Sequence, residues 1–77
     1  MLTIWLQQAL GELANLRSGE VFFLSDLFKG YEWKRISVPD RRQLGRMFLD
    51  QVTGQGNNYG VLALGKNSAN HERYRKV

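Results

Sequence analysis

The side chains of this chain that could do chemistry are mainly cationic, and they are concentrated in its second part. Residues 29–77 carry ten lysine and arginine side chains against four acidic ones, whereas residues 1–28 carry one basic side chain against three acidic ones. The formal net charge of the whole chain is +4. A basic region of this kind is typical of a protein that binds a polyanion such as nucleic acid. The alternative interpretation is a solvated surface that is basic without a partner.

Arg42, Gln43 and Arg46 share one face of a predicted helix. Because Arg42 and Arg46 are one helical turn apart, both guanidinium groups can reach neighbouring phosphates. In the alternative interpretation this face is simply solvated, and Arg46 pairs with Asp50 one turn later.

A second cationic group lies in the segment GKNSANHERYRK, residues 65–76, which is predicted to form the end of a β-hairpin. Strand alternation places His71, Arg73 and Arg75 in one row, opposite Tyr74 and its neighbours. Neighbouring cations in a row repel one another unless an anion lies along the row, which favours a bound polyanion. In the alternative interpretation, these charges protect an exposed edge strand from aggregation. The cationic residues of this segment that we expect to bind nucleic acid are Lys66, His71, Arg73, Arg75 and Lys76.

Aromatic residues are interleaved with these cations, as they are in grooves that bind single-stranded nucleic acid by stacking bases on rings. The candidates are Tyr31, Trp33, Tyr59 and Tyr74. Tyr59 and Tyr74 have polar neighbours in the sequence, so we expect their rings to be accessible for stacking. The alternative is that the rings complete the core, which is our expectation for Trp33.

The sequence offers little support for catalysis. The chain has no cysteine, which excludes disulfides, thiolate zinc sites and cysteine nucleophiles. His71 is the only histidine and has no set of partner ligands, so we expect neither a metal site nor a catalytic role for it. The glycine-rich segment 53–60 follows a helix and precedes a strand, the reverse of a phosphate-binding loop. We therefore predict a non-enzymatic protein without a cofactor.

The first half of the chain is predicted to supply a supporting helix, a strand and a short helix. Apolar residues recur every three or four positions over 2–16, which predicts one amphipathic helix that is too short to span a bilayer. Gly19 is expected to end this helix in the left-handed conformation. Residues 20–24 are β-branched and aromatic, which predicts a short strand. Ser25 is expected to cap a short helix, and residues 31–36 are predicted to form another helical turn.

The second half is predicted to form a longer helix and a hairpin. Ser37 is the expected N-cap of a helix that runs to about Val52, with Pro39 in its first turn. Gly45 costs this helix about 1 kcal/mol relative to alanine, and we expect it to permit a close helix contact. Residues 53–60 are predicted to be a loop, 61–66 and 71–77 the strands of the hairpin, and 67–70 its turn.

This order of elements predicts an α+β fold, a compact winged helix-turn-helix made of three helices, a short strand and a C-terminal β-hairpin wing. The strand at 20–24 is expected to pair with the hairpin. At 77 residues, the chain is predicted to be a single winged-helix domain, residues 1–77, of a cytoplasmic protein.

Residues 16–52 also resemble a small family long known only as a domain of unknown function, whose members occur on mobile elements of Gram-positive bacteria, including staphylococcal cassette chromosomes. The residues that carry the resemblance are Gly19, Phe22, Leu24, Asp26, Leu27, Phe28, Gly30, Trp33, Arg41, Leu44, Gly45 and Phe48. The resemblance implies a compact winged helix that binds single-stranded DNA beside element-encoded replication proteins such as a helicase or polymerase. It does not identify the residues that contact DNA.

We therefore expect a single-stranded-DNA-binding protein with little sequence preference. In this interpretation Arg42, Arg46 and the cationic hairpin hold phosphates, and Tyr59 or Tyr74 stacks on bases. Two alternatives stay open. One is a winged-helix repressor that reads duplex DNA with Gln43 and Arg46. The other is a protein-interaction module, an adaptor or a host-defence inhibitor, that binds through residues 1–16.

Overall fold

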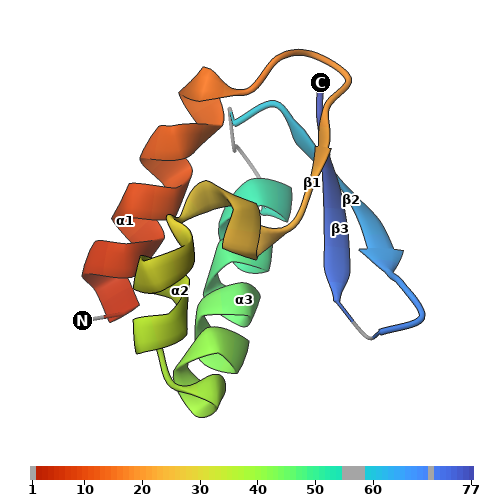
Figure 1. Cartoon of the computed structure of the whole chain (residues 1–77). Coiled ribbons are helices and arrows are strands. Elements are labelled where there is room, and N and C mark those ends of the chain that lie inside the picture. Colours follow the sequence, from red (N-terminus) through yellow and green to blue (C-terminus); the bar gives the residue numbers. More distant parts are fainter. Residues whose placement is uncertain (1, 55–58, 70) are drawn as a thin grey trace.

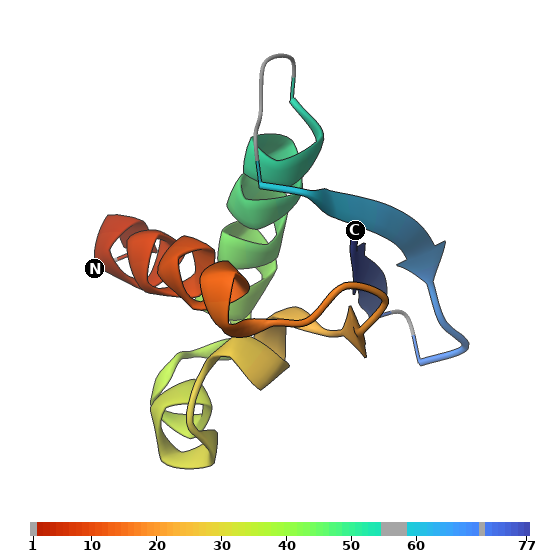
Figure 2. The same ribbon diagram turned by 90° about the horizontal axis from the view of Figure 1, so that it is seen from above.

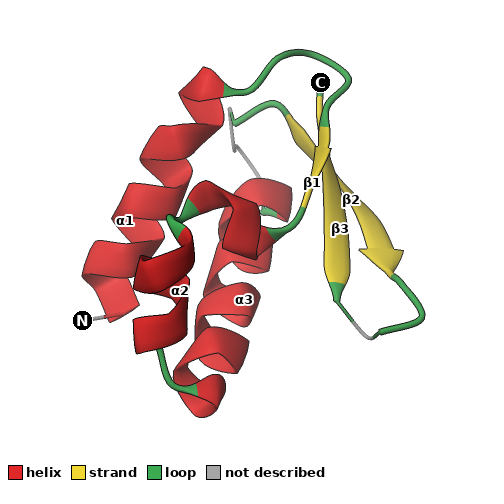
Figure 3. Ribbon diagram, viewed as in Figure 1, coloured by secondary structure: helices red, strands yellow, loops and turns green. Residues whose placement is uncertain are grey.

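The structure is a computed structural model that describes residues 2–54, 59–69 and 71–77. Helices pack on one side of a small antiparallel sheet (Figures 1 and 3). The α-helices within the described residues are α1 (Leu2–Glu12), α2 (Gly30–Arg35) and α3 (Val38–Thr53), and the strands are β1 (Val21–Phe22), β2 (Val61–Lys66) and β3 (Glu72–Lys76). Two 3₁₀ turns, Leu13–Asn15 and Leu24–Leu27, extend α1 and join β1 to α2. The predicted α+β winged-helix arrangement is confirmed.

The sheet has the strand order β1-β3-β2, so β3 lies in the centre and is antiparallel to both neighbours. Phe22 is paired with Tyr74 on one side of β3, and Lys66 with Glu72 on the other. The predicted pairing of the first strand with the hairpin is therefore correct. A bulge between Ala63 and Gly65 interrupts the hairpin, and Gly65 has a positive φ of 89° that favours glycine.

α3 lies between α1 and the sheet in both views of the molecule (Figures 1 and 2). The hydroxyl of Ser37 accepts a hydrogen bond from the backbone N–H of Asp40 at 3.4 Å, which confirms Ser37 as the N-cap of α3. Pro39 lies in the first turn, where its missing N–H costs nothing. Residues 55–58 of the predicted loop and residue 70 of the predicted turn lie outside the described residues.

Two predicted helix caps are wrong in position. The first helical segment ends at Asn15 and Leu16 is already extended, so Gly19 does not cap it. Gly19 instead has a φ of 90° in a tight turn closed by the N–H of Glu20 and the carbonyl of Arg17. The 3₁₀ turn after β1 starts one residue before Ser25, because the Asp26 carboxylate accepts a hydrogen bond from the N–H of Phe23.

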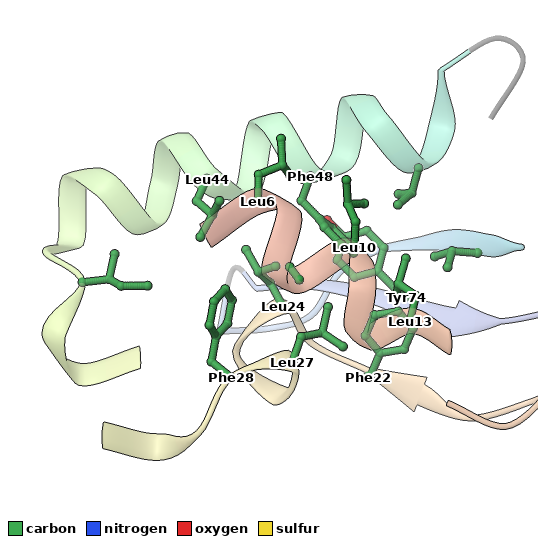
Figure 4. Packing of buried hydrophobic residues seen from close by; sticks show 14 residues of the cluster. Leu6, Leu10, Leu13, Phe22, Leu24, Leu27, Phe28, Leu44, Phe48 and Tyr74 are labelled. Carbon is green, nitrogen blue, oxygen red and sulfur yellow. The ribbon is translucent and has the colours of Figure 1, made fainter. Parts of the chain in front are cut away.

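The core lies between α3, α1 and the inner face of the sheet (Figure 4). Tyr74 is 1% exposed and lies between two phenylalanines: its ring stacks on Phe22 with centroids 5.6 Å apart and meets Phe48 edge-on at 5.0 Å. Leu44 and Phe48 are fully buried, as their predicted helix side requires. Among the described residues, no helix is long and apolar enough to cross a membrane.

Candidate nucleic-acid interface

A groove of about 660 Å³ runs between the first half of α3 and the tip of the β2–β3 hairpin. The 3₁₀ turn after β1 and Trp33 of α2 complete its walls. The charged and titratable side chains that line it are Arg41, Arg42, Arg46, Lys66, His71, Glu72 and Tyr74. The groove therefore combines residues from the helix face and from the hairpin that the sequence marked as two separate cationic groups.

The helix face and the hairpin tip contribute cations that have no partner of their own. Arg42 and Arg46 are exposed on α3, Lys66 is exposed at the end of β2, and His71 is exposed just before β3. Within the described part of the chain, the side chains of Arg42, Arg46 and Lys66 form no hydrogen bond or ion pair. The alternative pairing of Arg46 with Asp50 is therefore not formed, and these three charges are open to an anion.

Arg41 lines the same groove but is committed to the fold. Its Nε and Nη2 atoms donate hydrogen bonds to the carbonyl oxygen of Trp33 at 3.2 and 2.9 Å, and its guanidinium lies 5.1 Å from the centre of the Trp33 ring. The Trp33 ring also packs against Phe28, with ring centroids 5.6 Å apart. The expectation that Trp33 completes the core is correct, and Arg41 joins α2 to α3.

Phe23 lines the groove together with Trp33 and Tyr74, and the sequence pattern alone did not mark it as a site residue. Its half-buried ring lines the groove and meets the imidazole of His71 edge-on at a centroid distance of 6.2 Å. Strand alternation does indicate that Phe23 faces away from the core. Phe22 and Phe23 are neighbours and must point to opposite sides of the strand, and Phe22 is in the core. Placing Phe23 in a site required knowing that the hairpin tip comes back to it.

The two tyrosines predicted to stack on bases both pack in or against the core. The prediction for Tyr74 is wrong, because its ring is buried between Phe22 and Phe48. Tyr59 is half-buried and packs against the core, and its carbonyl accepts a hydrogen bond from Nζ of Lys76 at 3.1 Å. Lys76 is therefore engaged within the fold rather than free to bind phosphate, at the end of the hairpin opposite its tip.

The predicted alternation along β3 is correct, but it separates the hairpin's cations into two places. Glu72, Tyr74 and Lys76 are the less exposed residues of β3 and face the helices, whereas Arg73 and Arg75 are exposed on the outer face. Arg75 lies between Val21 of β1 and Leu62 of β2 in the pairing of the sheet. Arg73 and Arg75 thus belong to a different surface from the groove that His71 lines.

Charged side chains also lie near two tyrosine rings outside this row of cations. Tyr31 is 53% exposed on α2, with Nζ of Lys29 5.9 Å and Cζ of Arg35 5.0 Å from its ring centre. On the inner face of β3, burial and, to a smaller extent, the charge of Glu72 raise the pKa of Tyr74 to about 12.

The described residues contain no group of three or more histidine, aspartate and glutamate side chains that could hold a metal ion.

One comparison with known proteins gives a match, to a family model described as "Domain of unknown function (DUF1413)" over residues 7–76. Neither the curated proteins nor the solved structures yield a match. The matched residues cover α1 from residue 7 onward, all of α2 and α3, and the whole sheet. They also include every residue that lines the groove. The chain is therefore a member of the DUF1413 family of domains of unknown function.

Proposed function

We propose that this domain is a non-enzymatic binder of single-stranded DNA with little preference for sequence, and that the groove between α3 and the hairpin tip is its main contact surface. The observation that carries this proposal is the convergence of three unpartnered cations, Arg42, Arg46 and Lys66, on one groove. Fixed cations without partners at a concave surface attract a polyanion, and binding of its phosphates releases condensed counterions.

The lining of the groove favours a single strand over a duplex. Apolar and aromatic side chains, among them Phe23, Leu24 and Leu49, line the groove together with the cations. Unstacked bases can cover such surfaces, whereas the bases of a duplex are already stacked on one another. The family resemblance points the same way, and we extend the proposal to a cytoplasmic role in the replication or transfer of a mobile element, beside a helicase or polymerase.

Duplex DNA is the second candidate, and one observation favours it. Arg42, Gln43 and Arg46 are all exposed on α3, the helix that enters the major groove in winged-helix proteins that read duplex DNA. In that case Gln43 and Arg46 would read base edges. A role in protein interaction would instead use α1, where Ile4 is 65% exposed.

A titration by fluorescence anisotropy distinguishes these functions. The chain is mixed with labelled single-stranded DNA and with a duplex of the same sequence, each at two salt concentrations. We expect tighter binding to the single strand and weaker binding of both at the higher salt concentration. Equal or tighter binding of the duplex would favour the repressor, and binding of neither would favour the protein-interaction module.

A further inference from the structure

Gly45, in the middle of α3, lines the groove, and no neighbouring atom leaves too little room there for a side chain. The sequence led us to expect a close helix contact at Gly45, and the structure contradicts it: a Cβ atom placed there would meet nothing within 4 Å. Glycine is unfavourable inside a helix compared with alanine or leucine. Because Gly45 lies between the groove-lining residues Arg41, Arg42, Arg46 and Leu49, its missing side chain makes the groove deeper.

Glu72, which lines the same groove, carries an acceptor atom that lacks a donor. The Oε2 atom of Glu72 is buried and has no hydrogen-bond partner among the described residues. Lys66 is its neighbour across the hairpin, yet no hydrogen bond joins the two side chains. A buried carboxylate oxygen without a donor is costly, and groups of this kind in folded proteins usually receive a hydrogen bond from water or a ligand.

The other groove residues indicate what kind of ligand would bring that donor. The apolar wall and the ring of Phe23 suit a flat aromatic group, and the cations Arg42, Arg46 and Lys66 suit the phosphates attached to it. A nucleotide combines these properties, with a flat base that can donate hydrogen bonds and an anionic backbone. The carboxylate selects among bases, because it accepts from an amino group and repels a carbonyl oxygen.

We propose that the groove holds one unstacked base of a single strand and that Glu72 accepts a hydrogen bond from the base's exocyclic amino group. The proposal rests on the proposed function and adds to it a preference for one class of base at one position. Cytosine carries such an amino group at N4, whereas thymine carries a carbonyl oxygen at the corresponding place. The domain therefore binds cytosine-containing strands more tightly than strands of thymine alone.

The first test compares short oligomers of cytosine and of thymine, equal in length and at neutral pH. We expect the unmodified chain to bind the cytosine oligomer at least about tenfold more tightly, as one hydrogen bond to a charged acceptor predicts. In Glu72→Gln, whose amide can also donate to a carbonyl, this ratio should fall to near one. Asp50→Asn, which removes an equal charge from an exposed position on α3, should keep the ratio.

The second test fills the groove with a side chain through a substitution that also raises the helix propensity of α3. Gly45→Leu places a side chain in the groove, whereas Gly11→Leu makes the same change in α1, where a Cβ atom likewise meets nothing within 4 Å. Leucine is the better helix former, so both variants should melt at or above the temperature of the unmodified chain. Only Gly45→Leu should lose affinity for both oligomers, by tenfold or more.

Three outcomes would overturn the inference. Equal affinity of the unmodified chain for the two oligomers would show that the groove does not select an amino group. Unchanged binding by a folded Gly45→Leu variant would show that no base enters the groove. In both cases the proposed binding of single-stranded DNA would survive, although the second outcome would remove the groove as its base-contacting surface. Failure of the unmodified chain to bind either oligomer would instead contradict the proposed function, and this inference with it.

Discussion

Tyr74 is the residue whose environment differs most from what its sequence neighbours indicate. Glu72 and Arg73 precede it and Arg75 and Lys76 follow it, yet its ring lies in the core between Phe22 and Phe48. Strand alternation explains the pattern, because one face of β3 must cover the core even when its sequence is mostly charged. Its ring therefore contributes packing rather than recognition.

The phenol of Tyr74 makes the stability of the domain depend on alkaline pH. Burial, followed by the charge of Glu72, raises its pKa from an ordinary value of 10.0 to about 12. The folded chain thus holds the phenolic proton more tightly than the unfolded chain does. This contribution to stability is fully present below the unfolded pKa and is lost as the pH rises toward the folded pKa. In Tyr74→Phe this loss should disappear, while the packing is largely kept.

Denaturant unfolding at about pH 9 and about pH 11 measures this effect, since the two values lie on either side of the ordinary tyrosine pKa. Other titrating groups contribute equally to both proteins, so the informative quantity is the difference between them. The free energy of unfolding should fall more between the two pH values in the unmodified chain than in Tyr74→Phe. An equal fall in both would mean that the buried phenol does not control this dependence.

At the scale of elements, one side of α3 packs in the core and the opposite side lines the groove. Its apolar side, with Leu44, Phe48 and Val52 fully buried, packs against α1 and the sheet. Its other side presents Arg42 and Arg46 to the groove. The two roles can be separated by mutation because they use different residues of one helix.

Phe48→Ala tests the packing side. Phe48 is fully buried and its ring meets Tyr74 edge-on. Removing it should cost about 3–5 kcal/mol of unfolding free energy, because the change both loses buried surface and leaves a cavity. A small domain has only about 5–15 kcal/mol in total, so the melting temperature should fall sharply. A thermal melt followed by circular dichroism measures this, and an unchanged midpoint would contradict the assigned helix side.

Paired arginine variants test which element carries the phosphate contacts. Arg42→Ala with Arg46→Ala removes two charges from the groove, and Arg73→Ala with Arg75→Ala removes two from the outer face of β3. Each phosphate contact contributes roughly 0.7 to the slope of log affinity against log salt on single strands, so the groove pair should flatten it by about 1.4. The outer pair should change the slope little. The reverse result would place the strand across the outer face of the wing.

The sequence was sufficient for the order of elements but not for the composition of the site. Periodicity and capping residues such as Ser37 are local signals, so they located α3 and the hairpin correctly. The groove is made of residues far apart in the chain, for example Phe23 and His71, and depends on how the hairpin tip approaches α3. Local sequence signals do not show how closely the hairpin tip approaches α3. The sequence therefore did not identify Phe23 and Glu72 as groove residues, and it wrongly predicted Tyr74 to be accessible.

For the molecule as a whole, the unpartnered cations of the groove gather on the wing side of α3. α1 lies on one side of α3, and the wing lies on the other (Figures 1 and 2). The groove with its cations opens on the wing side. Of the acidic residues in the first 28 positions, Glu12 belongs to α1, whereas Glu20 and Asp26 lie just before β1 and in the turn after it. The cations of the groove attract an approaching polyanion to the wing side.

Binding of a single strand should raise the melting temperature of the whole domain. A ligand that binds only the folded state stabilises it by about 2.7 kcal/mol at a free concentration of one hundred times its Kd. In a domain of this size each kcal/mol corresponds to about 4–8 °C, so saturating single-stranded DNA should raise the midpoint by roughly 10–20 °C. The effect should shrink with added salt, because the affinity falls while the fold itself depends little on exposed charges.

The Arg42→Ala, Arg46→Ala double variant is the matched control for this measurement. Both side chains are exposed and form no hydrogen bond or ion pair within the described residues, so the variant should melt near the unmodified chain when no DNA is present. With the oligomer added, its midpoint should rise much less. If the unmodified chain shows no rise at saturating DNA, the folded state does not bind single strands. If the double variant rises equally, binding occurs outside the groove, because a stability gain from a ligand must come from the contacts that the ligand makes in the folded state.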